Sequence, residues 1–239
     1  MTGRKRITVI TNIILAVIIT AVISVSFIGE EPLPAYGGKE AEAIYNGNRA
    51  GGGVSLMINV YENTEVVEAM VETLNAFGAR ATFFVGGCWA DDNAAALKKI
   101  AESGHELANH GYFHKDHKSL GYEENKQEIE LTGAVVEALS GVKPRLFAPP
   151  SGSFGRNTLN AAYDLGYKVI MWSKDTIDWR DESESKIISR ATDNLTGGDL
   201  ILMHPKPHTL RCLPEIIARI LSGGYSLVTV SENIGDTAA

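Results

Sequence analysis

Cysteine is scarce in this sequence, with only Cys88 and Cys212 among 239 residues. Two cysteines exclude the disulfide framework on which small secreted domains depend. They leave two alternatives: one disulfide between the pair in an exported chain, or two inert thiols packed as small apolar side chains. The fold must therefore rest on apolar burial, and a chain of this length with 44% hydrophobic residues can form one sizeable core.

Basic residues are also few relative to acidic ones. The chain has 22 Lys and Arg against 29 Asp and Glu, a net charge of −7, and no basic stripe beyond the first six residues. Proteins that bind nucleic acid neutralise phosphates with lysine and arginine. This balance therefore argues against a nucleic acid partner.

Charged residues are absent from Ile7–Ile28, a mostly apolar run that follows Arg4, Lys5 and Arg6. As a helix rising about 1.5 Å per residue, this run is about 33 Å long and spans a bilayer. It exceeds the apolar core of a cleaved signal peptide, usually about 7 to 15 residues, and no clear Ala-x-Ala site follows it. An uncleaved anchor is therefore favoured over a cleaved signal. Because basic residues stay in the cytoplasm, everything after Gly29 is expected outside it.

These features predict three segments. Residues 1–29 are an N-terminal membrane anchor or uncleaved signal, residues 30–53 are an extracytoplasmic linker rich in Glu, Pro, Gly and Asn, and residues 54–239 are one folded domain. The predicted location is the cell membrane, with a single pass and an extracytoplasmic domain.

From Val54 onward, short apolar runs alternate with longer amphipathic stretches, which indicates a parallel sheet with crossover helices. Glycines that follow the helical stretches predict left-handed caps at 78, 104, 141, 166 and 223. Seven strands connected in this way favour an irregular (β/α) barrel, although periodicity leaves an open doubly wound sheet possible. No glycine-rich phosphate fingerprint follows the first strand to support nucleotide binding. The predicted strands are Val54–Val60, Ala81–Val85, His105–Ala108, Arg145–Ala148, Lys168–Trp172, Leu200–Met203 and Ser226–Val230.

Unusual polar residues follow these strands at their carboxyl ends, where the loops of a parallel barrel converge on one mouth. His110 and His114 follow the third strand, and with their spacing of four a helical turn would bring both imidazoles onto one face, where they could bind a borderline metal such as zinc. His204 ends an apolar strand, and Asp175 follows another. A carboxylate beside His204 would favour its protonated form, as a general acid requires. Turn chemistry is the alternative for Asp175 and for Asp178.

Taken together, these motifs resemble the polysaccharide deacetylases, the NodB-homology proteins of carbohydrate esterase family four, over nearly all of Val54 to Ile234. The wording around Phe147-Ala-Pro-Pro is similar to a branch associated with sporulation and cell-envelope glycans. The matching blocks are Ala81-Thr-Phe-Phe-Val85, Gly104-His-Glu-Leu-Ala-Asn-His110 with His114, Ala148-Pro-Pro-Ser-Gly152, Asp175-Thr-Ile-Asp-Trp179 and Leu202-Met-His204.

The resemblance implies metal-assisted hydrolysis of the N-acetyl amide of a cell-envelope polysaccharide such as peptidoglycan. It implies a divalent metal, zinc by its chemistry, held by His110 and His114. It implies that His204, tuned by Asp175, protonates the departing amine. The substrate-binding residues it implies are Pro150 and Ser151, whose backbone N–H holds the oxyanion, together with Trp179 and Leu202.

The first family block, Thr-Phe-Asp-Asp-Gly, is altered. Asn59 stands where the family has its catalytic base, and Val60 stands where it has its third metal ligand. Asparagine cannot accept a proton at neutral pH, and valine has no atom that binds a metal. The arginine that steadies the base is replaced by Ala148. Glu62 and Glu65 are candidates for a substitute ligand, with stabilisation of a helix start as their alternative role.

Three interpretations remain open. The chain is an impaired N-deacetylase, an inactive glycan-binding relative of such enzymes, or an envelope structural protein that has kept the barrel. The retained histidines favour chemistry, whereas the altered first block favours binding.

Overall fold

The computed structural model describes residues 41–236. The predicted membrane anchor and the first part of the predicted linker lie outside these residues. Between residues 41 and 236, no helix is both long enough and apolar enough to cross a membrane. Cys88 and Cys212 are both free thiols, which agrees with the second of the two alternatives and not with a disulfide between them.

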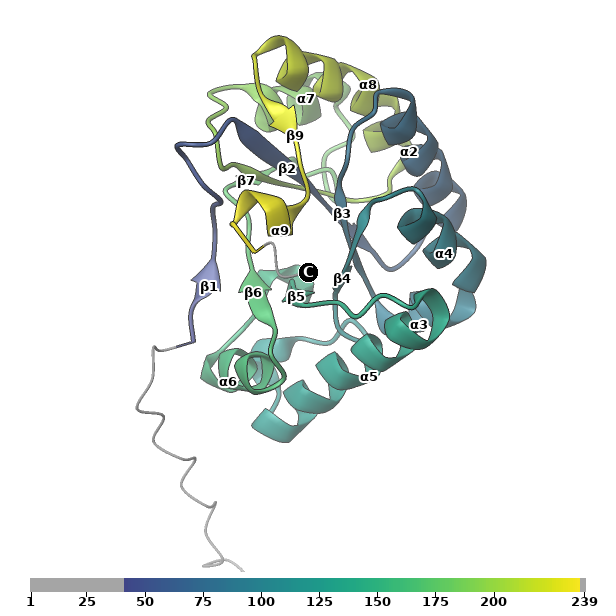
Figure 1. Ribbon diagram of the computed structural model, residues 1–239, viewed down its shortest axis with the longest axis vertical. Helices are drawn as coiled ribbons and strands as arrows, with labels where there is room; N and C mark the ends of the chain where they lie inside the picture. Colours follow the sequence, from purple (N-terminus) through teal and green to yellow (C-terminus); the bar gives the residue numbers. More distant parts are fainter. Residues whose placement is uncertain (1–40, 237–239) are drawn as a thin grey trace, which may run out of the picture. The chain divides into compact units, whose positions relative to one another are not determined.

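The described chain alternates strands and helices around a parallel sheet (Figure 1). The strands are β1 (Ala43–Ile44), β2 (Gly53–Val60), β3 (Thr82–Val85), β4 (Glu106–Asn109), β5 (Leu146–Phe147), β6 (Lys168–Ile170), β7 (Lys174–Asp175), β8 (Leu200–Met203) and β9 (Ser226–Leu227). The helices are α2 (Thr64–Ala76), α3 (Gly87–Asp92), α4 (Ala94–Glu102), α5 (Tyr122–Ser140), α6 (Arg156–Asp164), α7 (Glu184–Thr192), α8 (Pro207–Ser222) and α9 (Val230–Asn233), with 3₁₀ turns η1 (His117–Ser119) and η2 (Pro150–Gly152).

The sheet follows the order β1-β6-β5-β4-β3-β2-β8-β7, with β9 paired to β2, and every ladder is parallel. All seven predicted strands are present, with small shifts at their ends. The last one stops at Leu227 because Thr229 caps helix α9, its hydroxyl accepting the Glu232 N–H. The two strands that the sequence did not predict, β1 and β7, have only two residues each.

The barrel is incomplete. In the part of the chain that the structure describes, β1 and β7 end the path and no ladder joins them. The segment 168–175 bridges the gap, because it pairs with β5 at its start and with β8 at its end. The parallel α/β architecture agrees with the prediction. Within residues 41–236, the two halves of the sheet are connected on this side only by the segment that runs from β6 to β7, and not by a ladder of strands.

The predicted linker 30–53 differs from the structure over residues 41–53. Ala43 and Ile44 form strand β1 against β6, and the Gly47 N–H donates to the Gly198 carbonyl at 2.7 Å. Asn48 makes a similar bond to the Asn233 carbonyl at 2.8 Å. Composition suggested a spacer because the segment is polar and glycine-rich, but its backbone hydrogen bonds make it part of the folded domain.

Four of the five predicted glycine caps adopt a left-handed conformation. The exception follows α8, where Gly223 has φ −73° and the next residue, Gly224, has φ 82°. Either of two adjacent glycines can adopt the left-handed conformation, and the sequence pattern does not tell which of them does.

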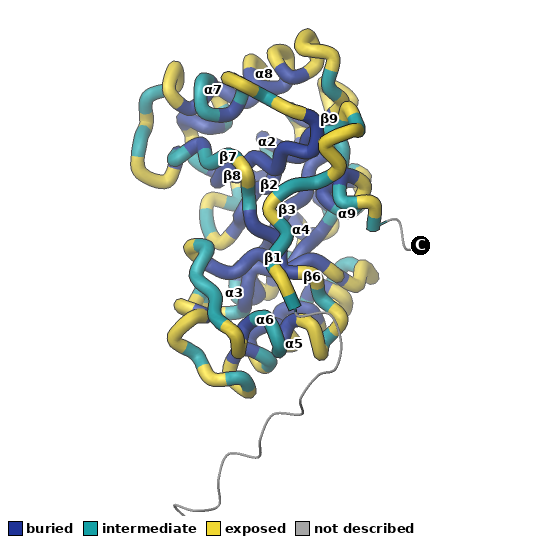
Figure 2. The backbone as a smooth tube through the Cα atoms, turned by 90° about the vertical axis from the view of Figure 1, so that its left-hand side faces the viewer, coloured by how far each residue is buried: buried dark blue, intermediate teal, exposed yellow. Residues whose placement is uncertain are grey.

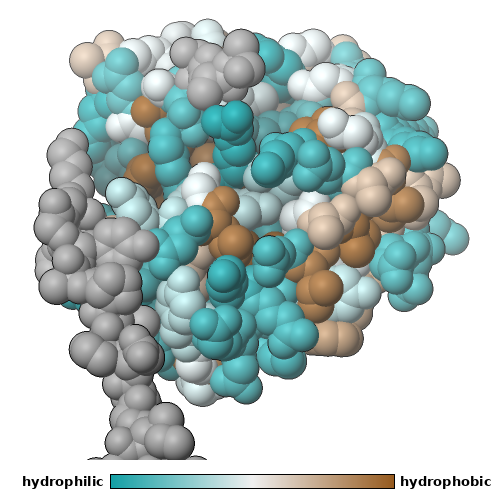
Figure 3. Space-filling model, turned by 60° about the horizontal axis from the view of Figure 1, so that its bottom comes forward, coloured by the Kyte–Doolittle hydropathy of each residue, from teal (hydrophilic) through white to brown (hydrophobic). Residues whose placement is uncertain are grey.

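Strand β2 shows how the fold directs its side chains. Leu56, Ile58 and Val60 belong to the large core cluster that also contains residues of α2 and α8. Met57 belongs to a second cluster, and Asn59 lines a pocket. Because successive strand residues face opposite sides, this alternation aims Asn59 and Val60 in opposite directions. Figure 2 shows the buried central strands, and Figure 3 shows a mostly hydrophilic face crossed by a narrow apolar band.

Candidate functional site

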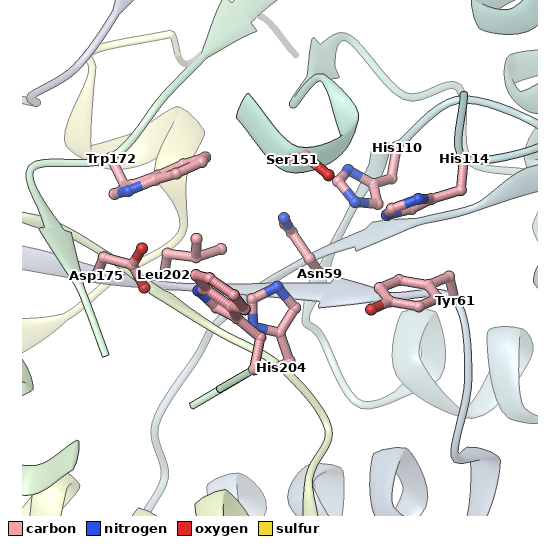
Figure 4. A pocket seen from close by; sticks show the side chains of 10 residues that line it. Asn59, Tyr61, His110, His114, Ser151, Trp172, Asp175, Leu202 and His204 are labelled. Atoms are coloured by element: carbon pink, nitrogen blue, oxygen red, sulfur yellow. The ribbon is translucent and has the colours of Figure 1, made fainter. Parts of the chain in front are cut away.

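A cavity of about 280 Å³ opens where the carboxyl ends of the strands meet (Figure 4). Its position agrees with the general location of sites in parallel α/β barrels. The lining residues are Asn59, Tyr61, His110, His114, Ser151, Trp172, Asp175, Trp179, Leu202 and His204. Residues far apart in sequence therefore share one space, as the motif positions predicted.

His110 and His114 lie together on the wall formed by the loop after β4. Their ring centroids are 5.2 Å apart, and the Tyr61 ring lies 4.3 Å from that of His114. The predicted helical turn is wrong, because this stretch is not helical and Gly111 and His114 have φ of 74° and 54°. Left-handed residues fold the loop back, so the imidazoles converge without a helix.

The protonation of both rings is set by their surroundings. Burial lowers the pKa of His110 to about 3, and the nearby His114 adds to the effect. Burial also lowers the pKa of His114. The Nδ1 of His110 lies 2.8 Å from the Ala148 carbonyl oxygen, which can only accept, so Nδ1 carries the proton. The other nitrogen, Nε2, then has a free lone pair, as metal binding requires.

Helix α5 holds this loop in place through a buried carboxylate. Glu128 is 3% exposed, and its Oε2 accepts the N–H groups of Tyr112 and Phe113 at 2.9 and 2.8 Å. Its Oε1 pairs with Lys115 at 2.9 Å. Glu128 thus fixes the backbone between the two histidines. The sequence gives no signal for this role, because a glutamate in a helix usually lies on its solvated face.

A second contact from α5 secures the end of the same loop. His117 Nδ1 lies 2.7 Å from the Asn125 Oδ1, and the Asn125 amide nitrogen donates to the carbonyls of His117, Leu120 and Gly121. Both side chains are fully buried. The loop that carries the imidazole pair is therefore tied to one helix at several points.

His204 lies on another wall, and its carboxylate partner is Asp178. The His204 Nδ1 is 2.7 Å from the Asp178 Oδ1. The second oxygen, Oδ2, accepts the His204 N–H and the Thr209 hydroxyl, each at 2.7 Å. The carboxylate beside His204 is therefore Asp178 and not the predicted Asp175.

Burial by itself would raise the pKa of Asp178, but the hydrogen bonds and charge of His204, with the Thr209 bond, outweigh it and hold the pKa below its ordinary value. Asp178 is therefore ionised and fully engaged at neutral pH. A carboxylate held in this way orients the imidazole.

Asp175 lines the cavity but makes the turn contact that was its alternative interpretation. Its Oδ1 accepts the Ile177 N–H at 2.7 Å, and Ile177 has φ 55°. This left-handed residue after a two-residue strand redirects the chain. The bend turns Asp178 towards His204. The periodicity of the sequence gives no sign of this bend, so it does not distinguish Asp178 from Asp175.

The end of β2 provides no carboxylate to the cavity. Asn59 is 3% exposed, and its buried Oδ1 has no hydrogen-bond partner. Val60 is fully buried in the core cluster and does not line the cavity. Glu62, a candidate substitute ligand, forms an ion pair with Lys206. Glu65 lies in the first turn of α2, as its alternative role predicted.

The donor set does not fit a catalytic zinc site, which has three protein ligands. Between residues 41 and 236, no group of three His, Cys, Asp or Glu side chains is arranged to hold a metal. His110 and His114 supply two donors, and the position that the family gives to the third is occupied by Val60.

Three of the four predicted substrate-binding residues line the cavity. Ser151, Leu202 and Trp179 line it, and Trp179 is 52% exposed at its rim. Pro150 is buried and does not line it, because η2 turns its ring towards Gly111. Trp172 also lines the wall, and the sequence analysis had treated it only as part of a strand.

Comparison with known proteins places this site in a family. Residues 47–170 match the family model for polysaccharide deacetylase. The uncharacterized protein YlxY of Bacillus subtilis is 37% identical over 198 residues, covering 83% of this chain and 62% of YlxY. A peptidoglycan-N-acetylglucosamine deacetylase of Bacillus cereus is 28% identical, over 74% of this chain and 66% of that protein. The chain thus spans about two thirds of the length of these relatives.

Among solved structures, a CE4 family pseudoenzyme from Bacillus anthracis has a TM-score of 0.79 and 32% sequence identity, covering 82% of this chain and 70% of that chain. A mutant of the same protein, described as having restored enzymatic activity, has a TM-score of 0.79 and 31% identity, covering 82% and 72%. With the matched family model, the shared fold and the histidine-lined cavity, this chain belongs to the polysaccharide deacetylase family.

Proposed function

We propose that this chain binds an N-acetylated cell-envelope glycan, peptidoglycan or a related polymer, and that its hydrolysis of the acetamido group is impaired. One observation carries the proposal: a neutral amide, Asn59, occupies the centre of a cavity that otherwise keeps the family's histidines. Losing a general base typically lowers a rate by about 10² to 10⁴. The incomplete donor set of His110 and His114 would lower metal affinity as well.

The names of the relatives support both halves of the proposal. The Bacillus cereus relative is named as a deacetylase of peptidoglycan N-acetylglucosamine, which supports the glycan class. The Bacillus anthracis structure is described as a pseudoenzyme, which supports impaired catalysis on this fold.

Other side chains of the cavity are placed to hold an acetylated sugar. Trp179 offers an exposed aromatic face to a sugar ring, and Leu202 and Trp172 supply apolar surface for the acetyl methyl. His204, oriented by Asp178, is placed to donate a proton to a departing amine. At the position of the family's base, the amide of Asn59 cannot remove a proton from water.

Acetate release from acetylated glycan oligomers tests the proposal. Wild-type protein, Asn59→Asp, and Asn59→Asp with Val60→Asp are compared, and bound metal is measured by elemental analysis of each. We expect release near background for the wild type and an increase of about 10² or more in a variant that regains the base. Val60 faces the core, so the double variant must bury a new carboxylate there or bend the strand. The single variant Asn59→Asp avoids this cost and is therefore needed in the comparison.

The proposal is overturned if the wild type holds a full equivalent of metal, loses it on His110→Ala, and releases acetate no more slowly than the Asn59→Asp variant. That result would establish the second candidate function, an active N-deacetylase. The intact His204–Asp178 pair favours this alternative, because a pure binding site has no need of an oriented proton donor.

The location is a separate proposal. The uncharged run Ile7–Ile28 after three basic residues supports a single-pass membrane anchor with the domain outside the cytoplasm. Fractionation of cells that express the full chain, followed by protease treatment of intact protoplasts, tests it. Protein in the soluble cytoplasmic fraction, or in membranes but protected from protease, would contradict it.

A further inference from the structure

The side chain of Asn59 presents a neutral hydrogen-bonding group at the centre of the cavity. Figure 4 shows its amide nitrogen directed towards the space between Trp172 and the histidine pair. Asn59 is 3% exposed, and its Oδ1 finds no partner in the protein. Because the Oδ1 is buried, the amide nitrogen is the part of Asn59 that a ligand can meet, and it offers a hydrogen-bond donor to the cavity.

The wall beside Asn59 supplies the opposite hydrogen-bonding character. His110 donates from Nδ1 to the Ala148 carbonyl, which leaves the Nε2 lone pair as an acceptor on the cavity side of the ring. Asn59 and His110 together offer a donor and an acceptor. A secondary amide carries one acceptor, its carbonyl oxygen, and one donor, its N–H. The acetamido group of an acetylated sugar is therefore complementary to this wall.

A deacetylated sugar is not complementary. Its protonated amine has only donors and a full positive charge, and it requires a carboxylate. Asn59 is neutral, and Asp178 is occupied by His204 and Thr209. Asp175 lines the cavity on the other side of Leu202 from Asn59, and one of its oxygens is held by the Ile177 N–H (Figure 4). No carboxylate therefore lies beside the amide.

We infer that Asn59 is a specificity-determining residue, and that the site selects acetylated over deacetylated glycan. The inference rests on the proposed function, because it requires the glycan to enter this cavity. Asparagine at the position of the family's catalytic base thereby lets the site recognise the acetyl group. Such a protein would remain on glycan that a deacetylase has not yet processed and would leave it once the acetyl groups are removed.

Calorimetric titration with two defined oligomers tests this selection. Fully N-acetylated and fully deacetylated glucosamine tetramers are titrated into the wild-type protein at pH 7.5, with a chelator present and mass spectrometry confirming intact ligand. We expect the acetylated tetramer to bind at least about tenfold more tightly, since an unpaired buried group or charge is worth that or more.

Two variants of Asn59 separate hydrogen bonding from charge. Asn59→Leu removes the amide without adding charge and is expected to weaken binding of the acetylated tetramer by about tenfold. Asn59→Asp places a carboxylate beside the amine and is expected to erase or reverse the preference. Trp179→Ala is the matched control, expected to weaken both ligands equally because its ring contacts sugar rather than the acetyl group. Circular dichroism verifies that each variant is folded.

The outcomes separate this inference from the proposed function. Equal affinity of the wild type for both tetramers, or an unchanged preference in Asn59→Asp, refutes selection by Asn59 and leaves glycan binding intact. Binding of neither tetramer, together with acetate release by the wild type, refutes the proposed function and the inference with it.

Discussion

The two sides of the cavity differ in how their polar groups are supported. At the loop after β4 and at the end of β8, two buried carboxylates have several partners: Glu128 accepts two backbone N–H groups, and Asp178 accepts three hydrogen bonds. At the end of β2, Asn59 Oδ1 is buried without a partner. The histidines are thus rigidly placed, whereas the position of the family's base is unsupported.

This difference separates positioning from chemistry. The supporting contacts come from helices α5 and α8 and stabilise the fold whether or not a reaction occurs. The residue at the end of β2 contributes to chemistry rather than to support, so its change leaves the surrounding cavity in place. Four substitutions, in order of decreasing effect on stability, test whether the two sides differ in this way.

Glu128→Ala should have the strongest effect. It leaves the backbone N–H groups of Tyr112 and Phe113, and Lys115, without their acceptor, and we expect the free energy of unfolding to fall by about 3 kcal/mol. Urea denaturation measures the change. Glu130→Ala, at an exposed position of the same helix, is the control and should cost less than about 0.5 kcal/mol. Equal losses in the two variants would show that the loop does not depend on α5.

Asp178→Asn should destabilise the other supported wall by about 2 kcal/mol, because an amide cannot accept all three hydrogen bonds that the carboxylate receives. Asp175→Asn is the matched control. Asp175 makes a single turn contact, so its replacement should cost less than about 1 kcal/mol. A larger loss for Asp175 would restore the sequence-based assignment of the tuning carboxylate.

His105, directly before β4, should make the stability of the protein depend on pH. Burial lowers the pKa of His105 from 6.5 to about 4. The unfolded chain therefore binds a proton below pH 6.5 while the folded chain does not, and stability falls as the pH drops from 6.5 towards 4, by up to about 1.4 kcal/mol per pH unit. In His105→Leu this contribution disappears. Urea denaturation at pH 7 and pH 5 should show a smaller acid loss for the variant, and an identical loss would contradict the predicted pKa.

Asn59→Leu should have almost no effect on stability. The wild-type amide oxygen has no partner to lose, so we expect a change within about 0.5 kcal/mol, of either sign. The same denaturation experiment applies. A loss near that of Glu128→Ala would mean that Asn59 is structurally supported, and the contrast between the two sides would fail.

Local patterns predicted the elements well and the contacts between them less well. Apolar runs and glycine punctuation located the strands, since burial and cap geometry act within a few residues. The motif positions also placed His110, His114, His204 and Asn59 at one mouth. The partner of His204 was misassigned, because the left-handed turn at Ile177 that selects Asp178 has no pattern of its own.

Residue type and spacing alone were enough to establish the alternation of strands and helices, the histidines of the cavity and the absence of carboxylates at residues 59 and 60. These features depend only on residue types and on residues that are close together in the sequence. Three further features emerged only in the folded molecule: Ala43 and Ile44 join the sheet, Glu128 supports the histidine loop, and Val60 faces the core while Asn59 faces the cavity. Each depends on which distant segment lies opposite, and that is settled when the chain packs as a whole.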